Sequence, residues 1–404
     1  MDSKCVMSES DRWLLPEGIE ELLPGQAERL EQLRRRLLDL FRSWGYELVF
    51  PPFIEYLESL LTGSGNDLDL QTFKLIDQLS GRMMGVRADM TPQVARIEAN
   101  RLQREEPVRL CYMGTVLRTV SDGFAGSRSP LQLGAELYGH AGIEADVEVL
   151  CLMLQMLDEV GLSNVHLDIG HVGIYRGLAE RAGFTPLQEQ EFFALLQRKA
   201  RPEIDEYLAD LDMDSELRGM LAGIATLNGG PEVLDTAAEV LREAGPAVLN
   251  ALANLRQIAD LAARRLPDIP LYYDLAELRG YHYKTGVVFA AFVPGCGQEV
   301  ARGGRYDDIG AVFGRARPAT GFSADLKLLM RLGEAQGDAV SPGIFAPAID
   351  DEALHAEIAA LRGRGERVIH ALPGQSGGAV EMGCDRCLVQ RDGEWRVEPV
   401  AAGQ

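Results

Sequence analysis

A carboxylate and a hydroxyl stand two residues apart, at Asp89 and Thr91, at what we expect to be a junction between a strand and a helix. Both side chains can face one cavity there. A carboxylate beside a hydroxyl receives an α-ammonium group well, because hydrogen bonds to an ionised acceptor are short and strong. Thr91 followed by Pro92 is also typical of a helix start, with the hydroxyl capping the first turn. The sequence leaves both interpretations open.

A glutamine and a glutamate, Gln132 and Glu136, lie four positions apart in the apolar run 132–138, which we expect to be a strand. Side chains four apart on a strand point to the same face. If that face is buried, both groups need partners, because an unpaired buried polar group is costly. A polar ligand would supply them, whereas a pair that faces solvent would need none. Arg118 and a glycine-rich, hairpin-like loop at 121–128 precede this strand.

Aromatic and cationic side chains crowd a turn within residues 278–289, which leads into another expected strand. Arg279, Tyr283 and Lys284 stand there between glycines, as in a pocket wall. An ordinary hairpin turn with polar residues at the surface would have the same composition. Paired glycines just before Tyr306 allow a backbone to approach another group closely.

Several chemistries have no motif in this chain. There is no GxxxxGK[ST], no GxGxxG that opens a helix after a strand, and no HExxH. Cys384 and Cys387 form a CxxC pair, but a zinc site normally needs a second pair of ligands nearby. The other cysteines are scattered, as free thiols in a reducing compartment are. We expect neither a metal nor a cofactor.

The net charge of −21 argues against nucleic acid as a partner, because such binders gain affinity from lysines and arginines that displace phosphate counterions. The densest basic run, 34–36, falls on an expected helix and is typical of a solvated face. No run approaches the roughly 18 apolar residues of a membrane helix. The polar N-terminus lacks the pattern of a secretory signal. We therefore expect a cytoplasmic protein without a membrane partner.

The elements that would position these residues alternate irregularly between helices and strands. This order indicates an α+β fold with an antiparallel sheet. Apolar residues recur every three or four positions in the expected helices. Helices are expected at 26–44 and 145–160, and strands at 46–50, 108–112, 132–138, 165–169, 271–275, 286–292 and 298–302.

The chain is expected to contain a core and a small C-terminal domain. Strand patterns are missing from about 184 to 266, so this stretch predicts a helical insertion in a core that spans 1–331. A loop-like run at 333–342 predicts the boundary. Residues 342–404 are expected to form a small α/β domain with a helix near 351–362, a strand near 368–371 and a terminal hairpin.

In their order and spacing, these groups resemble the histidyl-tRNA synthetases, a family of class II synthetases, over residues 12–331. The resemblance implies an antiparallel sheet flanked by helices. The matching runs are 15–24 at the family's start, 46–55 as the dimer-forming motif 1, 118–139 as motif 2, 279–286 as the histidine-specific motif, and 303–307 with 320–322 leading into motif 3.

The resemblance implies that the residues around the amino acid are mostly retained. Asp89 and Thr91 stand where the family holds the α-amino group, and Arg279 stands where an arginine touches the carboxylate. Lys284 departs from the family, which has an aromatic hydroxyl there. The implied histidine-binding set is Asp89, Thr91, Arg118, Gln132, Glu136, Arg279, Tyr283, Lys284 and Tyr306.

The same resemblance implies that the ATP site is lost. Arg118 is followed two positions on by Val120, where the family has a glutamate for adenine, and Pro130 replaces the aromatic residue that stacks on adenine. Asp325 and Leu328 replace a glycine and the arginine of the γ-phosphate. Exchanging that arginine for leucine removes a charge-assisted interaction of about 1.5–3 kcal/mol. We therefore expect no catalytic residue and no adenylation.

A synthetase-like core with an amino-acid pocket and no nucleotide site resembles the family of ATP phosphoribosyltransferase regulatory subunits. This resemblance implies a non-catalytic subunit in the first step of histidine biosynthesis, with the short-form catalytic subunit as partner and L-histidine as feedback effector. It also implies a homodimer within a hetero-oligomer. An active histidyl-tRNA synthetase or histidine-activating ligase is the competing interpretation. A scaffold that binds no small molecule is the third, because Lys284 alters the pocket.

Overall fold

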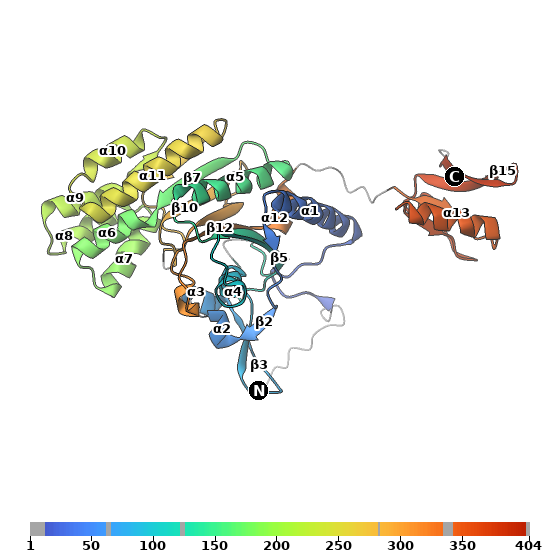
Figure 1. The fold of residues 1–404 in the computed structure, drawn as a ribbon, viewed down its shortest axis with the longest axis horizontal. Coiled ribbons are helices and arrows are strands. Elements are labelled where there is room, and N and C mark those ends of the chain that lie inside the picture. The colour runs from blue at the N-terminus through green and yellow to red at the C-terminus, as the bar shows by residue number, and fades with distance from the viewer. Residues whose placement is uncertain (1–12, 62–65, 122–125, 282, 334–341, 401–404) are drawn as a thin grey trace, which may run out of the picture. The chain divides into compact units, whose positions relative to one another are not determined.

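The computed structural model describes residues 13–61, 66–121, 126–281, 283–333 and 342–400 (Figure 1). Contacts within the chain divide it into two compact units, residues 1–21 with 32–334 and residues 22–31 with 335–404. Residues 334–341 of the expected boundary and 122–125 of the expected loop lie outside the described residues.

The larger unit is built on a nine-stranded sheet whose described neighbours run antiparallel, apart from the parallel pairs β1–β5 and β7–β9. The expected α+β class with an antiparallel sheet is confirmed. The strand expected at 298–302 begins later than predicted, because residues 298–300 precede β11 and do not belong to it. In spatial order the strands are β1 (Glu47–Leu48), β5 (Val108–Thr115), β6 (Leu131–Tyr138), β12 (Ala319–Asp325), β11 (Ala301–Arg305), β10 (Val287–Phe292), β7 (His166–His171), β9 (Leu271–Asp274) and β8 (Asn228–Gly229).

Helices supply the apolar cover of this sheet. Helix α5 (Ile143–Glu159) packs against β6, β11 and β12, and its expected apolar face is buried. Helix α1 (Pro24–Ser43) buries Leu33, Leu37 and Phe41, as its three- and four-residue spacing predicts. A short helix, α12 (Leu326–Leu332), follows β12 directly and contacts β6.

A second, three-stranded sheet was not predicted. Its order is β2 (Ile54–Tyr56), β4 (Met83–Val86) and β3 (Phe73–Ile76), with α2 (Leu57–Leu61) and α3 (Asn66–Gln71) between β2 and β3. Strands of three or four half-exposed residues carry too little alternation to be recognised. This sheet leads into α4 (Thr91–Ile97), which continues as a π-helical turn, Glu98–Leu102.

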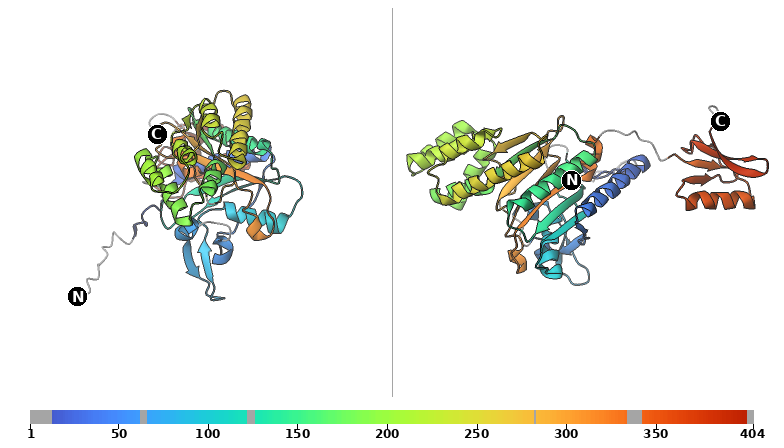
Figure 2. Two further views of the ribbon diagram at one scale, coloured as in Figure 1. Left: turned by 90° about the vertical axis from the view of Figure 1, so that its left-hand side faces the viewer. Right: turned by 45° about the horizontal axis from the view of Figure 1, so that its top comes forward.

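The stretch expected as an insertion is largely helical, and its green and yellow helices gather together in Figure 2. Its aromatic core includes Phe192, whose ring stacks on those of Tyr175 and Tyr207. One expectation is wrong, because the two-residue strand β8 interrupts the helices and pairs with β9. The helices of this stretch are α7 (Pro186–Gln197), α8 (Arg201–Ala209), α9 (Ser215–Ile224), α10 (Val233–Val240) and α11 (Pro246–Arg265), and α6 (Val172–Ala182) precedes them.

The smaller unit contains a four-stranded sheet covered by one helix. Its strand order is β14 (Val368–His370), β13 (Ile344–Ala346), β15 (Arg386–Arg391) and β16 (Glu394–Pro399). Helix α13 (Glu352–Gly363) begins after Asp351, whose side chain caps it, and buries Leu354, Ile358 and Leu361.

Candidate functional site

All nine residues of the predicted histidine-binding set line one cavity of about 580 Å³, which we call the amino-acid cavity. They come from the start of α4, from β6, from the segment after β5, from the turn before β10 and from the end of β11. Helix α7 adds a further wall through Gln190, Phe193 and Gln197. A concave site of this size with a few converging polar groups is suited to a small polar molecule.

Asp89, Thr91 and Gln132 hold one another at the start of α4. Asp89 Oδ1 accepts hydrogen bonds from the Thr91 backbone N–H at 2.9 Å and from Gln132 Nε2 at 2.8 Å. The Thr91 hydroxyl lies 3.0 Å from the Tyr112 hydroxyl and donates to Glu136 Oε1 at 3.3 Å. The residue at the N-cap position is Met90, which makes no side-chain capping bond, and Thr91 is the first residue of the helix itself. The interpretation of Thr91 as a helix cap is therefore wrong.

Glu136 is almost fully buried, with 1 % of its surface exposed, and Gln132 is buried as well. The Tyr112 hydroxyl donates to Glu136 Oε1 at 2.9 Å, and the Tyr306 hydroxyl donates to Oε2. Burial raises the pKa of the Glu136 carboxyl group to about 7, although both tyrosine hydrogen bonds lower it. The alternative of a solvent-facing pair on β6 is therefore wrong.

Lys284 brings a cation to the same cavity and is 5 % exposed. Its Nζ lies 5.2 Å from the ring centroids of both Tyr283 and Tyr306, whose faces attract a cation. Burial lowers the pKa of the ammonium group to about 7, although the Glu136 carboxylate raises it. The cavity thus contains a buried acid and a buried base that both neighbour Tyr306.

Two arginines line the cavity near its acids. Arg279 Nη1 lies 3.6 Å from Glu277 Oε2, and its guanidinium carbon lies 5.2 Å from the centroid of the Phe292 ring. Arg118 Nε donates to a backbone carbonyl at 3.3 Å. Guanidinium groups bind carboxylates well. With Asp89 as an acceptor for an ammonium group, the cavity offers partners for both charged groups of a free amino acid.

The turn that carries Lys284 is anchored by two residues that the sequence did not indicate. Arg176 on α6 donates through Nη2 to the backbone carbonyls of Tyr281, at 3.1 Å, and Lys284, at 2.9 Å. The Tyr281 hydroxyl donates to Glu189 Oε1 on α7 at 2.5 Å. Both anchors lie on helices where a charged residue looks like ordinary surface, so only the fold reveals their role.

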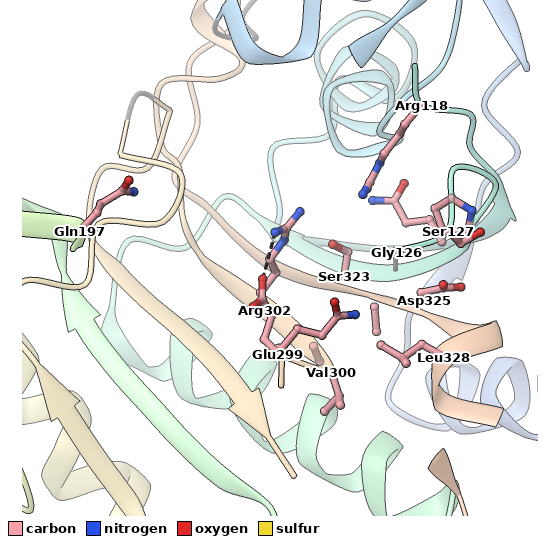
Figure 3. Close-up of a pocket in the computed structure, with 15 residues that line it drawn as sticks. Arg118, Gly126, Ser127, Gln197, Glu299, Val300, Arg302, Ser323, Asp325 and Leu328 are labelled. Atoms are coloured by element: carbon pink, nitrogen blue, oxygen red, sulfur yellow. Dashed lines mark hydrogen bonds and ion pairs between the residues drawn. The ribbon is translucent and has the colours of Figure 1, made fainter. Parts of the chain in front are cut away.

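A second cavity of about 690 Å³ adjoins the first (Figure 3). Pro130, Asp325 and Leu328 line it, whereas Val120 does not and is exposed. Arg302 Nη1 donates to Glu299 Oε1 at 3.1 Å in its wall, as the dashed line in Figure 3 shows. The residues common to both cavities are Arg118, Gln132, Gln197, Arg302 and Ser323.

Asp325 binds the protein's own backbone within this second cavity. Its Oδ1 accepts from the N–H groups of Leu131 and Lys327, at 3.0 Å each, and so caps α12 and joins it to β6. Lys327 Nζ in turn donates to the Ser129 carbonyl at 2.8 Å. These side chains stabilise the junction between a strand and a helix.

Two other kinds of feature are absent from the residues that the structure describes. These residues contain no group of three histidine, cysteine, aspartate or glutamate residues placed to hold a metal ion, and Cys384 and Cys387 are free thiols. Within the same residues, no helix combines the length and apolar character needed to cross a membrane.

Comparison with known proteins gives two family matches. Residues 18–329 match histidyl-tRNA synthetase, and residues 341–398 match the C-terminal domain of the ATP phosphoribosyltransferase subunit HisZ. The chain is 62% identical over 384 residues to the ATP phosphoribosyltransferase regulatory subunit of Thioalkalivibrio sulfidiphilus. The match covers 95% of this chain and 97% of that relative. The chain is 58% identical over 400 residues to the same subunit of Alkalilimnicola ehrlichii, at 98% and 100% coverage.

A solved structure supports the same likeness. An ATP phosphoribosyltransferase regulatory subunit/histidyl-tRNA synthetase from Bacillus halodurans superposes with a TM-score of 0.80 and 26% identity. The match covers 92% of this chain and 95% of that one.

Proposed function

This chain belongs to the family of ATP phosphoribosyltransferase regulatory subunits, and we propose that it controls a separate catalytic subunit by binding L-histidine in the amino-acid cavity. The resemblance predicted from the sequence is confirmed, and with it a role in histidine biosynthesis. The competing interpretation as an active synthetase is not favoured. The proposed partner is the short-form catalytic subunit.

The convergence of Asp89, Glu136 and Arg279 on one cavity is the observation that carries this proposal. A free amino acid needs an anion near its ammonium group and a cation near its carboxylate, and the cavity has both. Glu136 and Lys284 remain for the side chain of the ligand. A ligand of this kind regulates a partner if it binds one state of the complex more tightly than another.

We propose further that the second cavity does not bind ATP for catalysis. Leu328 cannot neutralise a phosphate, and Asp325 would repel it while already bonded to two backbone N–H groups. Loss of one charge-assisted hydrogen bond costs about 1.5–3 kcal/mol, and each 1.4 kcal/mol is roughly a tenfold change in rate. Adenylation of histidine is therefore expected to be negligible.

Titration calorimetry with L-histidine tests the proposal, on the full chain alone and in complex with the short-form catalytic subunit. We expect binding that Glu136→Gln weakens at least tenfold, together with loss of histidine inhibition in the complex. Glu159→Gln, at an exposed position of α5 that does not line the amino-acid cavity, is the control and should leave both unchanged. Histidine inhibition that survives Glu136→Gln would favour the scaffold interpretation. Pyrophosphate exchange that depends on histidine and ATP would favour the synthetase.

We propose that a second copy of the chain covers the segment after α1. Leu48, Phe50 and Phe53 are 41%, 74% and 42% exposed, and β1 forms an edge of the nine-stranded sheet. An edge strand beside exposed apolar residues is suited to pairing with another chain. Light scattering should report a dimer for the wild type and a smaller species for Phe50→Ser, whereas Leu249→Ser, at another exposed apolar position, should remain dimeric.

A further inference from the structure

Lys284 is a largely buried side chain that lines the amino-acid cavity, and its ammonium group has no acceptor in the described part of the chain. Its ammonium group lies over the rings of Tyr283 and Tyr306, and no described oxygen lies within hydrogen-bonding distance of Nζ. A buried charge needs compensation by hydrogen bonds, and the two ring contacts replace only part of the lost hydration. A lone pair on a ligand atom in the cavity would complete its surroundings.

Glu136 presents the complementary need. Three hydroxyl groups surround its carboxylate, those of Tyr112 and Thr91 at Oε1 and that of Tyr306 at Oε2. An ionised carboxylate offers about four lone-pair sites, so one site is left for an N–H group of a ligand. The same cavity therefore offers one acceptor at Glu136 and donors at Lys284.

We propose that Lys284 and Glu136 together make the cavity select an imidazole ring in its neutral form. One ring N–H donates to Glu136, and the other ring nitrogen accepts from the Lys284 ammonium group. An imidazolium ring has two donors and no acceptor, so its second N–H would face a like charge. A hydroxyl at position 284 would both donate and accept and would not make this distinction. The inference rests on the proposed function, because it assumes that histidine enters this cavity.

Several charged and titratable groups surround Lys284 and contribute to this selection. Glu136 and Asp89 favour its charged form, as does Asp146 on α5, whereas Arg302 on β11 opposes it. Tyr283 and Tyr306 contact it through their rings. The free imidazole has a pKa of about 6.5, so only about a tenth of it is neutral at pH 5.5 and about nine tenths at pH 7.5. Histidine affinity should therefore fall at least tenfold between these two pH values, because Glu136, with a pKa of about 7, also takes up a proton and loses an acceptor site for the ring.

Calorimetry of L-histidine binding to the full chain at pH 7.5 and pH 5.5 tests the proposal. We expect the wild type to bind at least tenfold more weakly at pH 5.5. Lys284→Met should bind more weakly at pH 7.5 and should lose or reverse the pH dependence, because the imidazolium then no longer faces the ammonium group at position 284. Lys199→Met is the control, since its Nζ pairs with Asp274 at 2.7 Å and does not line the cavity. An unchanged affinity and pH dependence in Lys284→Met would overturn the proposal.

A ring analogue tests the same point without a substitution, in case Lys284→Met does not fold. The ring of 1,2,4-triazolylalanine stays neutral over this pH range and keeps an N–H donor and nitrogen acceptors. The wild type should bind it, and its affinity should fall less than that of histidine at pH 5.5. If the wild type binds histidine but not this analogue, the inference about the neutral ring is wrong, whereas the proposed function is unaffected. If histidine itself does not bind at either pH, the proposed function fails first.

Discussion

Glu136 and Gly321 stand directly opposite each other on the neighbouring strands β6 and β12, and the carboxylate fills the space that a side chain at position 321 would take. A Cβ atom on Gly321 would lie 1.5 Å from Glu136 Oε2. The pairing of these two strands therefore leaves room for the carboxylate in the wall of the cavity, where Tyr112 and Tyr306 donate to it.

Gly321→Ala is expected to displace the Glu136 carboxylate. Overpacking of a buried site should lower the free energy of unfolding by about 1–3 kcal/mol, and histidine binding should be lost. Urea denaturation and calorimetry measure the two effects. Gly219→Ala, in the middle of α9, is the control, because among the described residues no atom lies within 4 Å of its added Cβ. The free energy of unfolding of this control should rise by up to about 1 kcal/mol. A normal histidine affinity in Gly321→Ala would show that the Glu136 carboxylate does not need this space.

Lys284→Met is expected to stabilise the protein without ligand. Its ammonium group has no hydrogen-bond acceptor among the described residues, and burying such a charge costs free energy that an apolar side chain of similar size does not. The folded pKa of about 7 lies below the ordinary value of 10.5, so the unfolded wild type binds its proton first as the pH falls. The advantage of the variant should therefore be larger at pH 7 than at pH 10. Urea denaturation at both pH values checks this, and a stability below that of the wild type at pH 7 would refute it.

His171 is expected to make folding weaker in acid. It caps α6, where its Nδ1 accepts from the Gly173 N–H at 3.1 Å, and burial lowers its pKa from 6.5 to about 4. The unfolded chain therefore takes up this proton first, so the stabilisation is complete above about pH 6.5 and is lost as the pH falls toward 4. Between pH 7 and pH 4.5, protonation linked to His171 should lower the free energy of unfolding by on the order of 2 kcal/mol.

Substitution of His171 separates this contribution from those of the carboxylates. Asparagine caps helices well and does not titrate, so His171→Asn should show a smaller loss of stability between pH 7 and pH 4.5. Urea denaturation of both proteins at the two pH values gives the difference. Equal losses in the two proteins would exclude His171 as the cause.

Arg176→Met is expected to weaken histidine binding about tenfold, because two hydrogen bonds from a charged donor to the Lys284 turn are lost. Arg176 is a positioning residue, so the pH dependence of binding should survive while the affinity falls. Calorimetry at two pH values separates these readouts. Arg181→Met on the same helix is the control, since Arg181 bonds only to the carbonyl of Glu243 in the described structure. A normal affinity in Arg176→Met would show that α6 does not hold the turn.

The sequence indicated the main sheet because its strands are long, apolar and regularly spaced. Gln132 and Glu136 share one face for the same reason, since strand geometry repeats every two residues. The three strands of the second sheet and the two-residue β8 were missed, because they are too short to show a period. The seven-residue central strand β12 was missed as well, because its mixture of small, polar and apolar residues shows no clear alternation. Thr91 followed by Pro92 was ambiguous, since a cap and a cavity residue have the same local sequence.

By itself, the sequence determined which side chains are available, which of them share a strand, and the family to which their order belongs. Only the tertiary structure decided that Glu136 and Lys284 are both buried at Tyr306, that Gly321 leaves room for the carboxylate, and that Arg176 holds the Lys284 turn. The physical reason is that burial and pairing depend on neighbours far along the chain. A residue's type states the charge it can carry, whereas its neighbours in space determine the free energy of carrying it.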